Sequence, residues 1–89
     1  LQPLLNDMRH PLAPKAKQRR DAARLALRNA LECEYGWRRA VEMRSKPPSE
    51  QESIAVVFAM AEAQTAETEY AVAVETDAAI TRLLTRSEP

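Results

Sequence analysis

Aromatic residues, cysteine, histidine and glycine are scarce in this sequence, and their scarcity excludes most kinds of catalytic and metal site. Phe, Trp and Tyr make up 4% of the 89 residues, and Cys, His and Gly occur once each. One Cys forms no disulfide within the chain, and one Cys with one His is too few for a zinc site. A single Gly excludes a glycine-rich phosphate loop. We therefore expect no catalytic, cofactor-binding or metal-binding residues, no small-molecule substrate and no enzymatic activity.

The few chemically reactive side chains stand alone. His10 lies in a Pro-rich segment, and no pattern of nucleophile and base surrounds it. Cys33 lies among apolar residues, where we expect it to be a small buried hydrophobe. The acidic residues between positions 62 and 77 are expected to be solvated or to pair with Arg rather than to bind a metal.

Long apolar runs are also missing. The longest one covers residues 54–61, whereas a helix needs about 20 apolar residues to span a bilayer. The N-terminal residues lack the continuous apolar segment of a secretory signal. These features predict a soluble, cytoplasmic protein that does not bind membranes.

The six prolines divide the chain into segments. They stand at positions 3, 11, 14, 47, 48 and 89, and the long intervals between them are rich in helix formers. Ser49 and Glu52 fit the capping box that begins a helix. The sequence predicts an irregular Pro/Leu-rich arm over 1–14, a helical hairpin over 15–86 (helix 15–44, turn 45–49, helix 50–86) and a tail over 87–89.

A β-hairpin is the alternative for the second half of the chain. Residues 54–60 and 70–74 are rich in β-branched side chains. However, residues 62–69 between them contain no Gly, Pro, Asn or Asp, one of which a tight hairpin turn usually requires. We therefore favour a helix.

The net charge of zero conceals two oppositely charged halves. Residues 1–46 carry eleven Lys and Arg against five acids, and residues 47–89 carry eight acids against two Arg. In an antiparallel hairpin these halves lie side by side, which favours that pairing over association of like helices. The alternative is that part of the basic half contacts phosphates in a nucleic-acid-binding oligomer. The residues proposed for that contact are Lys17, Arg20, Arg24 and Arg28. No helix-turn-helix or aromatic stacking platform accompanies them, so this function is the less favoured one.

The second helix carries apolar residues on two sides, which indicates burial on two sides. One set is assigned to the core of the hairpin: Leu27, Trp37, Val41, Ile54, Phe58, Val72 and Leu83. The other is assigned to a protein interface: Val56, Met60, Ala63, Tyr70, Val74, Ile80 and Leu84. Two helices alone rarely form a stable domain. We therefore expect an all-α antiparallel hairpin that completes a four-helix bundle, as a homodimer or on another helical protein. The function expected from this is a protein–protein interaction module, such as a small adaptor, chaperone-like or scaffold subunit.

Overall fold

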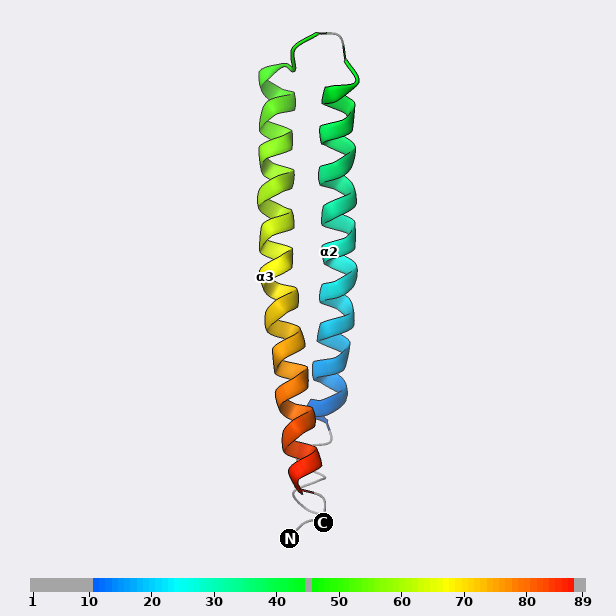
Figure 1. Cartoon of the computed structure of the whole chain (residues 1–89), viewed down its shortest axis with the longest axis vertical. Helices are drawn as coiled ribbons and strands as arrows, with labels where there is room; N and C mark the ends of the chain where they lie inside the picture. The colour runs from blue at the N-terminus through cyan, green and yellow to red at the C-terminus, as the bar shows by residue number, and fades with distance from the viewer. Residues whose placement is uncertain (1–10, 45, 88–89) are drawn as a thin grey trace.

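The hairpin consists of two long helices that run antiparallel and side by side (Figure 1). The computed structural model describes residues 11–44 and 46–87; helix α2 spans Leu12–Glu42 and helix α3 spans Glu50–Ser87. The described residues contain no strand, so the all-helical prediction is confirmed and the β-hairpin alternative is wrong. Most of the arm, residues 1–10, and the last two tail residues lie outside the described residues.

Helix α2 begins three residues earlier than predicted. Pro14 lies within its first turn, where backbone N–H groups have no helical acceptor and a proline therefore costs no hydrogen bond. The helix ends at Glu42, two residues before the predicted end, and the N–H of Met43 donates to the carbonyl of Arg39 at 3.0 Å. The prolines at 47 and 48 then keep the chain out of the helical conformation.

A reciprocal capping box begins helix α3. The N–H of Glu52 donates to Ser49 Oγ at 3.2 Å, and the N–H of Ser49 donates to Glu52 Oε1 at 3.3 Å. Arg44, which follows the end of α2, also forms an ion pair with Glu52. The box therefore fixes the start of α3, and the ion pair joins it to the end of α2.

Removal of the cap is expected to destabilise the hairpin. Ser49→Ala leaves an N–H of the first turn without its acceptor, and such a loss lowers the free energy of unfolding by about 1 kcal/mol. Ser53→Ala, at an exposed position one turn later, is the matched control and is expected to be neutral or slightly stabilising. Urea unfolding followed by circular dichroism measures both. Equal losses in the two variants would contradict a capping role for Ser49.

The cap also makes stability depend on pH. The hydrogen bonds from Ser49, together with the nearby Arg44, lower the pKa of Glu52 below its ordinary value of 4.5. The stabilisation is therefore complete above that value and is lost as the pH falls through the lower pKa of the folded state. As the pH falls, the free energy of unfolding is expected to decrease less in Ser49→Ala than in the wild type. Urea titrations of both proteins across this pH range measure the difference.

Threonines are accommodated in α3 through backbone hydrogen bonds. The hydroxyls of Thr68, Thr76 and Thr85 each donate to the carbonyl four residues earlier, at 2.8–3.2 Å. Bonding of this kind satisfies the hydroxyl within the helix itself. These β-branched polar residues are therefore compatible with a helix.

The two helices meet along a seam with a seven-residue repeat, in which contacting positions alternate three and four residues apart, as in a coiled coil. On α2 the least exposed positions are Ala16, Arg20, Ala23, Leu27, Ala30, Glu34 and Val41. On α3 they include Val56, Ala59, Ala63, Ala66, Tyr70, Ala73, Asp77, Ile80 and Leu84. Among the described residues, the buried apolar side chains are all alanines, at positions 16, 59, 63 and 73. Alanine buries little area, so the seam is a close but thin core.

The two apolar stripes of α3 are exchanged relative to the prediction. Val56, Ala63, Tyr70, Ile80 and Leu84, predicted as an outer interface, lie in the seam, whereas Met60 and Val74 lie at its edge, 41% and 37% exposed.

The residues predicted as core of α3 are the exposed ones. Ile54, Phe58, Val72 and Leu83 are 46–64% exposed. The physical reason is shape, because four of the nine seam positions named on α3 are alanines, at 59, 63, 66 and 73, and their small side chains let the helices approach closely over this part of the seam. From α2, Leu27 and Val41 lie in the seam, and Trp37 lies at its edge, 40% exposed.

Candidate protein interaction surface

Large apolar side chains stay exposed on both helices. On α2 they are Leu12, Leu25, Leu31, Tyr35 and Trp37. On α3 they are Ile54, Val57, Phe58, Met60, Val72, Val74 and Leu83. Scattered exposed hydrophobics are normal on proteins, so their arrangement around the hairpin decides whether they form a surface.

The seam divides the hairpin into two broad sides. In an antiparallel pair, equivalent positions of the seven-residue repeat lie on the same side of the plane that contains both axes. Two surface grooves agree with this. Lys17 of α2 and Thr81 of α3 line one groove, and Leu12 of α2 and Leu83 of α3 line another. Counting in sevens from these residues gives one row of positions on each helix for each side. On the second side, the row three residues further along lies next to it and contains Gly36 of α2 and Phe58 and Val72 of α3.

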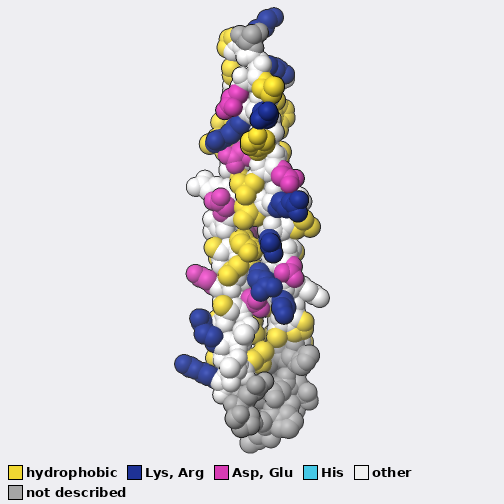
Figure 2. Space-filling model, turned by 45° about the vertical axis from the view of Figure 1, so that its right-hand side comes forward, with side chains coloured by type: hydrophobic (Ala, Val, Ile, Leu, Met, Phe, Trp, Pro, Cys, Tyr) yellow, Lys and Arg dark blue, Asp and Glu magenta, His cyan; other side chains and the backbone are white. Residues whose placement is uncertain are grey.

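One side, here called the charged face, carries mostly polar residues. Its positions are Lys17, Arg24, Leu31 and Arg38 on α2, and Met60, Glu67, Val74 and Thr81 on α3. The view in Figure 2 shows Lys and Arg side chains standing among Asp and Glu side chains, with hydrophobic ones between them. Neither sign of charge forms a continuous patch in that view.

The opposite side, here called the apolar face, is small on α2 and bulky on α3. Its apolar and small residues on α2 are Leu12, Ala22, Ala26, Cys33, Gly36 and Ala40. On α3 its main apolar residues are Phe58, Val72, Ala79 and Leu83. Five charged residues share this side, namely Lys15, Arg19, Glu62, Glu69 and Arg86. Cys33 is exposed here, which corrects the expectation that it is buried.

Gly36 leaves one position of the apolar face without a side chain. A Cβ atom placed on it would meet nothing within 4 Å, so no contact inside the hairpin requires a glycine there. Glycine in a helix interior costs about 1 kcal/mol relative to alanine. Within the hairpin this cost has no compensation, whereas a helix docked from outside could approach closely at this position.

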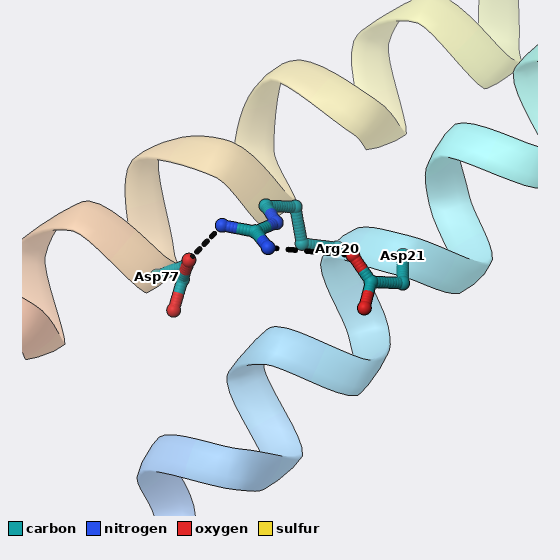
Figure 3. A network of polar contacts seen from close by, with 3 residues as sticks. All are labelled: Arg20, Asp21 and Asp77. Atoms are coloured by element: carbon teal, nitrogen blue, oxygen red, sulfur yellow. Dashed lines mark hydrogen bonds and ion pairs between the residues drawn. The ribbon is translucent and has the colours of Figure 1, made fainter.

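An ion pair crosses the seam near its open end. Arg20 Nη1 lies 2.6 Å from Asp77 Oδ2, and Arg20 Nη2 lies 3.4 Å from Asp21 Oδ1 (Figure 3). The Asp77 side chain is 13% exposed and that of Arg20 is 33% exposed. The Arg20–Asp77 contact is thus partly buried and joins the basic helix to the acidic one.

The four residues considered for nucleic-acid contact are not brought together as one free basic surface. Arg20 lies in the seam with Asp77, and Arg28 pairs with Glu32 at 3.3 Å. Lys17 and Arg24 are exposed, and the described part of the chain contains no ion pair to either. Two of the four side chains are therefore already engaged by acids of the same chain.

The helices carry opposite net charges. Helix α2 has eight Lys and Arg and four acids, a formal charge of +4, and α3 has seven acids and two Arg, a formal charge of −5.

Within residues 11–44 and 46–87, no three His, Cys, Asp or Glu side chains are placed to hold a metal ion. Neither helix has a stretch apolar and long enough to cross a membrane.

Sequence reasoning did not identify the alanines at 59 and 73 or Asp77 as seam residues. Their spacing is the signal that could have found them, because positions 59, 63, 66, 70, 73 and 77 follow one seven-residue repeat.

No family model matches the sequence, and no curated protein and no solved structure is significantly similar to it.

Proposed function

We propose that this chain is a protein–protein interaction module, of the adaptor or scaffold kind, which packs its apolar face against helices of a partner. The observation that carries the proposal is the amount of surface left uncovered. The chain exposes 7270 Å², whereas a compact monomeric protein of its 10.0 kDa exposes about 5,200 Å². Its radius of gyration is 19.9 Å, against about 12 Å for a compact domain of this length.

The composition of the apolar face supports docking of helices in particular. Phe58 and Leu83 supply side chains that are 64% and 53% exposed, and the alanines and Gly36 of α2 allow a helix axis to come close. Interface cores are depleted in charge and enriched in aromatic residues and Met relative to ordinary surface. The charged face also exposes Met60, but four of its eight residues, Lys17, Arg24, Arg38 and Glu67, are charged.

Nucleic-acid binding has less support. Arg20 and Arg28 of the basic set are paired within the chain, and the remaining pair, Lys17 and Arg24, supplies few phosphate contacts. A contact of so few cations releases few counterions, so it would give only weak binding.

Photo-crosslinking in the native host tests the proposed function. A photoreactive amino acid at Phe58, on the apolar face, is expected to give discrete crosslinked products, whether to the same chain or to another protein. The same group at Gln18, exposed on the outer side of α2, is the matched control and is expected to give only background. Equal background at both positions would overturn the proposal.

A further inference from the structure

We infer that the occupant of the apolar face is a second copy of this chain, packed so that the turns of both hairpins lie at the same end of a four-helix bundle. This inference rests on the proposed function, because it names the partner of the same face. Three features of the hairpin support this occupant and orientation. They are the positions of large and small side chains along the hairpin axis, the charges of the two helices and the uncovered area.

The contacts across the seam fix which residues lie level with one another. Arg20 meets Asp77 at one end and Arg44 meets Glu52 at the other. Because the helices are antiparallel, each step up α2 corresponds to one step down α3. Phe58 therefore lies level with Gly36 and Ala40, and Val72 lies level with Ala22 and Ala26.

Two face-to-face arrangements of identical hairpins have twofold symmetry. In the first, the axis runs along the hairpin, so both turns lie at the same end and each α2 packs on the α3 of the other copy. In the second, the axis runs across the hairpin, so the turns lie at opposite ends and like helices pack on each other. The first arrangement keeps every residue at its own level.

Side-chain size selects the first arrangement. Because levels are kept, Phe58 of one copy lies over Gly36 and Ala40 of the other, and Val72 lies over the alanines at 22 and 26. Each large side chain thus meets a position with little or no side chain, which gives the interdigitation that close packing requires. The second arrangement places small residues of α2 over small residues and large ones of α3 over large ones.

Charge selects the same arrangement. Packing α2 on α3 of the other copy places a helix of charge +4 against one of −5, as inside the hairpin. The second arrangement places acidic α3 against acidic α3. Glu62 and Glu69, which lie on the apolar face, would then share an interface with the same acids of the second copy. In the first arrangement they lie instead over uncharged residues of α2, near Cys33 and Asn29, so this repulsion is avoided.

The uncovered area is sufficient for such a dimer. A standard interface buries about 800 Å² on each partner. The chain exposes 7270 Å², roughly 2,000 Å² more than a compact protein of its mass. The excess over a compact protein is thus larger than the area that a standard interface buries on one partner.

Sedimentation equilibrium and electron–electron distance measurement on the purified full chain test the inference. A nitroxide label is attached at Lys46→Cys, in the turn, in a Cys33→Ser background. The expected result is a dimer with the two labels within about 25 Å, the width of a four-helix bundle. Turns at opposite ends would place the labels about 45 Å apart or more, the length of α2.

Each outcome decides a separate point. A dimer with the long distance overturns the orientation, and a folded monomer at high concentration overturns self-association. Neither outcome affects the proposed function, which fails only if crosslinking from position 58 fails. Phe58→Ala is expected to raise the dimer dissociation constant about tenfold or more, and Val57→Ala, exposed on the other side of α3, leaves it unchanged. Equal effects of the two would place the interface elsewhere.

Discussion

Replacement of Ala73 by leucine is expected to destabilise the hairpin by about 1–3 kcal/mol, enough to unfold much of a chain with so thin a core. Ala73 is 1% exposed and lies in the seam between α2 and α3. The larger side chain has no cavity to fill, so the helices must separate, and neighbouring alanine contacts are lost with them. Urea unfolding at several protein concentrations measures the loss.

The matched control for Ala73 is Ala71. It belongs to the same helix but is exposed, so Ala71→Leu is expected to change stability by no more than about 0.5 kcal/mol. A leucine at 73 that is tolerated as well as one at 71 would mean that the helices are not held in close contact. The alanine seam would then not be the core of this fold.

Loss of the Asp77 carboxylate is expected to have the second large effect. Asp77→Ala leaves the guanidinium of Arg20 in the seam with only its longer contact to Asp21 at 3.4 Å, at a cost of about 1–3 kcal/mol. Arg20 is one-third exposed, so water compensates part of the loss and the larger costs of fully buried pairs do not apply. The free energies of Arg20→Ala, Asp77→Ala and the double variant give the coupling between the two residues.

The Arg28–Glu32 pair provides the control for that cycle. Both side chains are more than 60% exposed and one helical turn apart, so their coupling is expected to be about 0.3–0.5 kcal/mol and to fall with salt. The Arg20–Asp77 coupling is expected to exceed it, at about 1 kcal/mol, and to respond less to salt. Equal couplings would contradict a structural role for the ion pair across the seam.

The ion pair also bears on how the register of the hairpin is specified. Alanine contacts alone discriminate poorly between registers, because a shift by one repeat places alanine on alanine again. Arg20 and Asp77 meet in one register only, and the capping box with Arg44 fixes the other end of the hairpin. Specificity in this seam therefore comes from a few polar contacts, while its area comes from small apolar ones.

The candidate surface was less predictable than the helices. Hydrophobicity pointed to Phe58 and Val72 as core, because large apolar side chains gain most from burial. The structure exposes them and buries alanines instead. Hydrophobicity alone places the stripe with Ile54 and Phe58 in the core. It takes no account of the fit that two helices need over about 45 Å, the length of α2.

The amino-acid sequence by itself determined the elements of this protein: where the helices break, because prolines cannot continue them, and where α3 begins, because Ser49 and Glu52 satisfy its first N–H groups. It also determined that the basic and acidic halves lie side by side. The tertiary structure alone decided which side of α3 faces α2. Both sides are apolar enough, but the one with alanines at 59, 63 and 73 lets the helices pack closely over the middle of the seam, and Phe58, Val72 and Leu83 are thereby left exposed.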